Sequence, residues 1–234
     1  MNKQTTARWL AATVIASVAV LAACGGSEGE LGPEMQATDA PAASSLATVA
    51  SASAFDGQAL QSLSVAEAQS LAFMREEERL AQDVYMSSAL RWPAVPVFEK
   101  IASSEATHTA AVKALLDRYQ LPDPMAGLPT GVFFTPDFQA LYDALVAASS
   151  VSLVEALKVG AQIEELDMRD IEAQMMVVDN ADILSVYDNL LRGSRNHLRA
   201  FMKVLVQLGG SYTPQYISQE QFDSIVTSPM ETGG

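Results

Sequence analysis

The chain contains two histidines, and the first follows a glutamate at a spacing that suits metal binding. Glu105 precedes His108 by three positions, so on an α-helix their side chains share one face, about 4.5 Å apart along the axis. That spacing lets the carboxylate bridge toward two metal ions while the imidazole binds one. The pair alone is a weak signal, because a single histidine on an apolar face is more often a hydrogen-bonded core residue.

Further acids and the second histidine lie in other segments. Glu164 and Asp167 are also three positions apart, so both carboxylates share a helix face, and His197 supplies the second imidazole. Carboxylate and imidazole donors without a thiolate favour iron or manganese, although zinc could occupy the same donors. The sequence therefore indicates a metal site assembled from several helices.

Four long helices are predicted to position these residues. The first and third start at capping boxes that open with Ser64 and Ser152. Pro96 suits the first turn of the second helix, and the glycine pair at 209–210 stops the fourth. The predicted helices span Ser64–Ala89, Pro96–Tyr119, Ser152–Val178 and 181–208.

The connection between the second and third helices is long and is predicted to carry a shorter helix, from Thr135-Pro136 to Ala147. No run of strict two-residue alternation predicts a strand. The expected fold is all-α, a ferritin-like four-helix bundle over residues 62–210 with this long crossover. The tail, residues 211–234, holds one short helix near Gln219–Val226.

Each long helix has an apolar stripe that polar residues interrupt near its middle. Positions spaced alternately by three and four residues face the interior of a bundle and are normally apolar. Burying an unpaired carboxylate costs several kcal/mol, so a cation at the centre would be the common compensation. The interrupting residues are Glu78, Glu105, His108, Glu164, Asp167 and His197.

Less specific interpretations stay open at some positions. A run of like charges such as 76–78 is usually a solvated face, and we expect at least one of its glutamates to be solvated. Glu77 competes with Glu78 as the inward-facing acid, because it lies on a rival apolar stripe. Asp167 could instead be a surface acid paired with Arg169.

Four blocks of the sequence together resemble the ferritin-like carboxylate-bridged di-iron domains, which include the rubrerythrins. The blocks are residues 74–85, 104–108, 163–167 and 193–197. More narrowly, they are similar to an uncharacterised bacterial branch of that superfamily, a domain of unknown function (DUF2202-like). The resemblance implies a ligand set of Glu78, Glu105, His108, Glu164 and His197.

One position departs from the superfamily pattern, which has a glutamate three residues before the second histidine. Here that residue is Ser194. Asp167 would replace the lost carboxylate from the neighbouring helix. Alternatively, the second metal position binds its ion weakly, or the cluster binds a single metal ion.

The resemblance implies two iron ions, or iron with manganese, that react with dioxygen or hydrogen peroxide as in a ferroxidase or peroxidase. The sequence has no cysteine-rich electron-transfer segment, so electrons would come from a partner or from Fe(II) itself. The alternatives are a non-catalytic metal-binding or sequestering protein and a metal-free interaction bundle. A dimer is compatible with any of these.

The first 24 residues are predicted to be a targeting signal. A short basic start precedes the apolar run Trp9–Ala23, which is too short to span a bilayer. The run ends at Cys24, in a context that resembles the lipidation signal of bacterial lipoproteins. Residues 25–61 have the composition of a disordered, acidic, Ala- and Ser-rich tether. We expect an extracytoplasmic protein held by lipid at the outer membrane or facing the periplasm.

Charge and cysteine content exclude several classes of function. The net charge is −14, and cleavage before Cys24 would remove two basic residues and no acidic one, giving −16. Such a chain lacks the basic surface that nucleic acids require. A single cysteine excludes a disulfide scaffold within the chain. The sequence also has no Walker loop, no GxGxxG and no HExxH motif.

Overall fold

A computed structural model describes residues 60–232. They all belong to one compact unit. The predicted signal, the lipidation site at Cys24 and nearly all of the predicted tether lie outside the described residues. Within those residues, no helix combines the length and the apolar character needed to cross a membrane.

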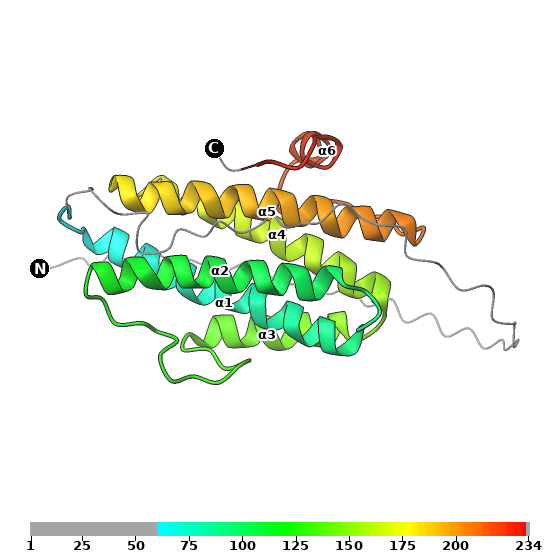
Figure 1. Cartoon of the computed structure of the whole chain (residues 1–234), viewed down its shortest axis with the longest axis horizontal. Coiled ribbons are helices and arrows are strands. Elements are labelled where there is room, and N and C mark those ends of the chain that lie inside the picture. Colours follow the sequence, from blue (N-terminus) through cyan, green and yellow to red (C-terminus); the bar gives the residue numbers. More distant parts are fainter. Residues whose placement is uncertain (1–59, 233–234) are drawn as a thin grey trace, which may run out of the picture. The chain divides into compact units, whose positions relative to one another are not determined.

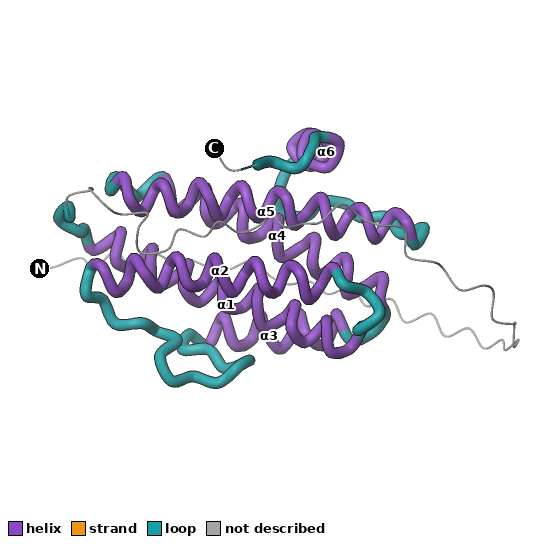
Figure 2. The backbone as a smooth tube through the Cα atoms, in the orientation of Figure 1, coloured by secondary structure: helices purple, strands orange, loops and turns teal. Residues whose placement is uncertain are grey.

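The described residues form an all-α helical bundle, as predicted (Figure 1). They consist of helices, loops and turns without a strand (Figure 2). A shorter helix, α3 (Pro136–Ser149), lies in the crossover, and α6 (Gln219–Thr227) lies in the tail. The four long helices are α1 (Val65–Arg91), α2 (Val97–Arg118), α4 (Leu153–Met175) and α5 (Ala181–Gln207).

The capping residues fix most helix ends close to the predicted positions. The Ser64 side chain accepts the Glu67 N–H and the Glu67 carboxylate accepts the Ser64 N–H, which completes the first capping box. Only half of the second box forms: Ser152 accepts the Glu155 N–H, while the Glu155 carboxylate pairs with a lysine. Pro96 is the N-cap of α2 and not its first helical residue.

Helix α4 ends three residues before the predicted end at Val178. The cause is a carboxylate from a distant helix. Glu67, buried on α1, accepts the backbone N–H groups of Asp179 and Asn180 at 3.2 and 3.0 Å. These contacts hold the turn before α5 outside the helix.

Two separate apolar clusters fill the bundle, and a polar layer lies between them. On α1 the clusters use residues 71–74 and 80–85, on α2 residues 111–116 and 98–102, and on α5 residues 183–190 and 198–205. Glu78, Glu105, His108 and His197 fall between these segments, whereas Glu164 and Asp167 of α4 lie beside Ile163 and Met168, which belong to the cluster of residues 80–85. The clusters therefore bury that polar layer from both ends of the bundle.

The crossover is tied to α1 by buried charged side chains. Arg75 pairs with Asp123 at 3.0 Å, and the Glu76 carboxylate accepts the Thr135 N–H at 2.9 Å, just before α3 begins. The expectation that the run 76–78 has a solvated member is therefore wrong, because all three glutamates are buried.

Candidate metal centre

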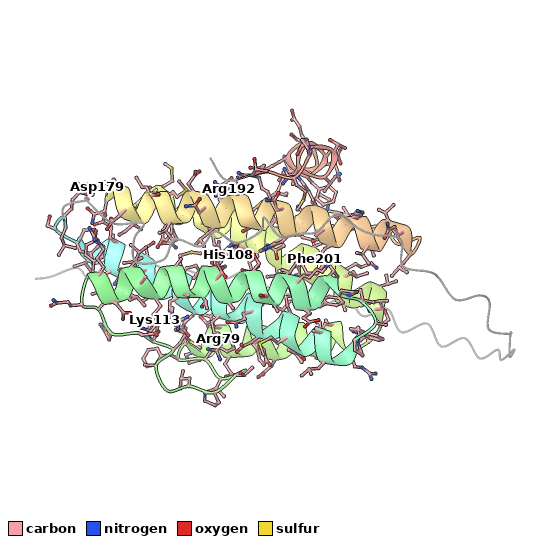
Figure 3. The ribbon with its side chains drawn as sticks, viewed as in Figure 1. Arg79, His108, Lys113, Asp179, Arg192 and Phe201 are labelled. Carbon is pink, nitrogen blue, oxygen red and sulfur yellow. The ribbon has the colours of Figure 1, made fainter. Side chains whose placement is uncertain are left out.

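The six predicted site residues come together at the middle of the bundle, in the polar layer between the two apolar clusters. Their four carboxylates are each at most 5% exposed, and the His197 side chain is 4% exposed. The His108 side chain is 12% exposed and lies at the seam between α2 and α5 (Figure 3). The members are Glu78 of α1, Glu105 and His108 of α2, Glu164 and Asp167 of α4, and His197 of α5.

The Glu105 carboxylate lies between the two imidazoles. Its Oε2 is 2.8 Å from His108 Nδ1, and its Oε1 is 2.7 Å from His197 Nδ1. One candidate ligand atom from each of these three residues lies within 4.8 Å of the others. A carboxylate that reaches two imidazoles through its two oxygens has the arrangement that a metal-bridging ligand needs.

A second carboxylate flanks each imidazole. Glu78 Oε2 is 3.3 Å from His108 Nδ1, and Glu164 Oε2 is 3.5 Å from His197 Nδ1. The residues thus form two similar halves, each with one imidazole and one carboxylate, on either side of Glu105. Such a paired donor set fits two cations better than one.

Asp167 contacts Ser194, the residue at which the sequence departs from the pattern of the ferritin-like domains that it resembles. The Ser194 hydroxyl is hydrogen-bonded to Asp167 Oδ2, and both side chains are buried. The interpretation of Asp167 as a surface acid is therefore wrong; Arg169 pairs with Asp170 instead. A buried carboxylate of α4 therefore contacts the serine of α5 that precedes His197 by three residues.

Several polar atoms of the cluster are buried without a hydrogen-bond partner among residues 60–232. They are both carboxylate oxygens of Glu78, Oδ1 of Asp167 and Nδ1 of His197, whose 2.7 Å approach to Glu105 does not have hydrogen-bond geometry. Buried polar groups normally have partners, because an unmet one costs about 1–3 kcal/mol, and more when it is charged. The unmet atoms converge on one region, which fits a bound cation.

Other buried acids in the bundle have partners of a different kind. Besides Glu67 and Glu76, Asp83 accepts the Gly131 N–H at 2.8 Å, and Glu165 accepts the backbone N–H groups of Gln215 and Tyr216. These carboxylates hold loops and the tail. These buried acids therefore differ from the acids that face the histidines, because they bind backbone N–H groups.

Burial and neighbouring charges shift the pKa values of the residues in the cluster. Burial raises the pKa of Glu78 to about 7 in spite of the nearby His108. Burial, with the adjacent charge of Glu78, also raises the pKa of Asp167 well above its ordinary value. Burial disfavours the charged form of His197, but the Glu105 and Glu164 carboxylates outweigh it and raise the pKa of His197 to about 9. A metal that binds at neutral pH must displace these protons.

The pKa of Glu105 moves in the opposite direction. Burial acts to raise it, but the attraction of His197 and then of His108 outweighs burial and lowers the pKa of Glu105 below its usual range. Glu105 is thus an anion between two imidazoles, as a bridging ligand must be.

Two hydroxyl groups orient the cluster, and the sequence analysis gave neither a role at the site. The Tyr85 hydroxyl donates to Glu164 Oε1 at 2.6 Å, and Ser104 Oγ is hydrogen-bonded to His197 Nε2 at 2.9 Å. The second contact leaves Nδ1 of His197 directed at Glu105. Both hydroxyls lie in the sequence blocks that carry the family resemblance, but spacing alone does not separate them from core residues.

A glycine provides the space for His108. A Cβ atom at Gly193 would lie 2.6 Å from His108 Nε2, closer than real Cβ atoms approach a neighbour. The His108 ring therefore occupies the position of the missing side chain on α5. The spacing of acids and histidines gave no reason to single out Gly193.

The structure distinguishes Glu78 from Glu77. Glu78 approaches His108, whereas Glu77 is buried beside the acids of α4, where burial and then the charge of Asp170 raise the pKa of Glu77 well above its ordinary value. Glu78 is therefore the member of the run that meets the histidines.

Comparisons with known proteins find relatives across the bundle. The family model described as "Uncharacterized protein domain (DUF2202)" matches residues 67–229. Uncharacterized protein MJ0754 of Methanocaldococcus jannaschii is 49% identical over 173 residues, which cover 74% of this chain and 93% of that protein. The crystal structure of hypothetical protein MJ0754 from Methanococcus jannaschii matches with a TM-score of 0.73 and 47% identity, covering 75% of this chain and 99% of that one. All six site residues fall within the matched family region.

Proposed function

The chain belongs to the DUF2202 family, and we propose that it binds two metal ions, iron or manganese, at the centre of its bundle as a ferritin-like protein. One observation carries this proposal: buried carboxylate and imidazole atoms from three helices, α1, α4 and α5, converge without hydrogen-bond partners among the described residues. Two divalent cations would balance the four carboxylates of the cluster. They would replace the protons that the metal-free cluster holds.

The donor chemistry supports the choice of metal. Four carboxylates and two imidazoles, with no thiolate, match the preferences of ferrous and manganous ions. Two halves that share Glu105 match a dinuclear centre, whose ions typically lie about 3.5–4 Å apart. The resemblance of four sequence blocks to carboxylate-bridged di-iron domains also supports the proposal, and these blocks contain the same six residues.

We infer that the loaded centre reduces dioxygen or hydrogen peroxide. Two bound ferrous ions would supply two electrons, enough to reduce one peroxide molecule with two protons to two water molecules. Tyr85 orients Glu164 for this role, and the Ser194 hydroxyl holds Asp167. Hydrogen bonds of this kind to metal ligands typically change affinity or activity by about 10- to 100-fold. The two apolar clusters, one toward each end of the bundle, exclude bulk water from the centre.

A sequestering role is the second candidate, and the strongly acidic composition favours it. A net charge of −14 concentrates cations near the protein surface. The two candidates differ in turnover. A binder is oxidised once for each load of Fe(II), whereas a catalyst consumes peroxide repeatedly when a reductant is supplied.

Turnover can be measured on protein loaded anaerobically with Fe(II) and freed of unbound iron. Hydrogen peroxide and excess ascorbate are added, and peroxide is followed over time. Catalysis predicts consumption of many equivalents of peroxide, and its loss in Glu105→Ala. A single equivalent per pair of irons would support sequestration instead.

We also propose that the protein is a lipoprotein, anchored through Cys24 outside the cytoplasm. This proposal rests on the sequence around Cys24. Labelled palmitate fed to bacteria that express the chain should enter the wild-type protein and not Cys24→Ala. Equal labelling of both, or of neither, would contradict the anchor.

A further inference from the structure

The segment that follows α6 folds back onto the outer face of α5, next to the site. Glu231 pairs with Arg195, at 2.8 Å for Nε to Oε1 and 2.5 Å for Nη2 to Oε2. Arg199 Nη2 also donates to Glu231 Oε1, at 2.8 Å. One carboxylate near the chain terminus thus joins two arginines on successive turns of α5.

Asn196 binds the backbone of the same residue. Its Nδ2 donates to the Glu231 carbonyl oxygen at 2.9 Å, and its Oδ1 accepts the Glu231 N–H at 2.8 Å. Asn196 Oδ1 also accepts from Arg199 Nη1 at 2.8 Å, so the side chains that hold Glu231 contact one another. We call Arg195, Asn196, Arg199 and Glu231 the C-terminal clasp.

The clasp encloses the turn of α5 that presents His197 to the site. Arg195 and Asn196 precede His197 directly, and Arg199 follows it two residues later. The clasp side chains meet the tail, while the His197 ring meets Glu105 and Ser104. We propose that Glu231 is a positioning residue, which fixes the rotation of α5 and so holds His197 against Glu105. The inference deepens the proposed metal centre and rests on it where metal affinity is concerned.

Small rotations of α5 are large on the scale of metal ligation. A side-chain atom about 6 Å from the helix axis moves by about 1 Å when the helix turns by about 10°. Ligand sets need to be held within about 0.5 Å of their productive geometry. His197 Nδ1 is 2.7 Å from Glu105 Oε1, so such a rotation would remove the contact between these residues.

The charged groups of the clasp stay ionised at neutral pH, which keeps its ion pairs intact. Hydrogen bonds from Arg195 lower the pKa of Glu231 to about 2, so the carboxylate stays ionised throughout the neutral range. Arg199 keeps other partners if Glu231 loses its charge, since it also donates to the Ile225 carbonyl and to Ser228. Glu231→Gln is therefore expected to loosen the clasp while α6 stays docked and the chain stays folded.

The experiment compares Glu231→Gln with a matched control. Glu220→Gln makes the same change at an exposed acid in the first turn of α6. The full chain, purified without a histidine tag, is studied by NMR of its imidazole nitrogens in the metal-free state and by titration with Co(II). Because the chain has two histidines, the imidazole spectrum contains the nitrogen signals of two rings, those of His108 and His197.

We expect Glu231→Gln to shift the His197 imidazole resonances, to change the visible spectrum of bound Co(II), and to weaken Co(II) binding about tenfold. Glu220→Gln should leave all three unchanged. Wild-type His197 resonances and Co(II) affinity in Glu231→Gln, even with a lower Tm, would overturn the proposal. If the wild-type chain binds no Co(II) but the His197 resonances still shift, the clasp stands and the metal function falls.

Discussion

The hydroxyl of Ser194 on α5 is hydrogen-bonded to the carboxylate of Asp167 on α4, so a polar contact joins these two helices within the buried cluster. The remaining Asp167 oxygen, Oδ1, has no hydrogen-bond partner among residues 60–232. Asp167 is thus the fourth buried carboxylate of the cluster, beside Glu78, Glu105 and Glu164.

Asp167→Asn should separate metal binding from stability. The change removes a carboxyl group whose ionisation is suppressed on folding by burial and by the charge of Glu78, so the metal-free variant is expected to unfold at a Tm several degrees higher than wild type. The loaded variant should hold less metal, because one carboxylate is lost. Calorimetry of both forms with elemental analysis measures the two effects. Asp188→Asn, at an exposed acid of α5, is the control and should change neither.

Glu76 and Glu78 should respond oppositely to the same substitution. Glu76→Gln weakens the contact with the Thr135 N–H and is expected to cost about 1–3 kcal/mol of unfolding free energy without loss of metal. Glu78→Gln should stabilise the metal-free chain and weaken metal binding, because its oxygens have no hydrogen-bond partner within the described part of the chain. Urea unfolding with and without metal tests both, and equal behaviour would contradict the division of the buried acids.

The stability of the metal-free chain should depend on pH through Glu78. Folding raises the pKa of this carboxyl from 4.5 to about 7, because burial disfavours the charge. The folded chain then binds the proton more tightly than the unfolded chain, so unfolding free energy falls as pH rises from about 4.5 to about 7. The advantage of Glu78→Gln over wild type should therefore grow across this window. An advantage that stays constant between about pH 5 and about pH 8 would contradict the prediction.

Gly193→Ala should disturb His108 without removing any ligand. The added Cβ would lie 2.6 Å from His108 Nε2, so the ring must move away from α5. We expect metal affinity to fall about tenfold, with shifted His108 imidazole resonances. Arg192→Ala changes the neighbouring side chain and should retain wild-type affinity. A normal affinity in Gly193→Ala would show that His108 is not held by this contact.

Much of the fold follows from the sequence because its signals are local. Ser64 and Ser152 cap helices through contacts three residues along the chain, and the glycine pair ends α5. The end of α4 was missed because Glu67, on another helix, holds the turn that follows it. Contacts between distant segments leave no periodic signal in a single sequence.

The positions of the cluster residues could be predicted because an interruption of an apolar stripe is also a local signal. Interruptions of the apolar stripes identified six residues that the structure brings together. The stripes could not show that Glu76 binds a loop while Glu78 meets a histidine, since both are buried acids on one helix. Nor could they assign Tyr85 or Gly193, whose roles depend on partners more than 70 residues away.

The central claim is that this cluster holds two metal ions, and counting them tests it most directly. The chain is loaded anaerobically with Fe(II), freed of unbound metal, and assayed by elemental analysis beside Glu105→Ala and His197→Ala. We expect two irons per wild-type chain and a loss in both variants, with the larger loss in Glu105→Ala because that carboxylate contacts both imidazoles. No bound metal in the wild-type chain, with Glu105→Ala at least as stable, would contradict the claim.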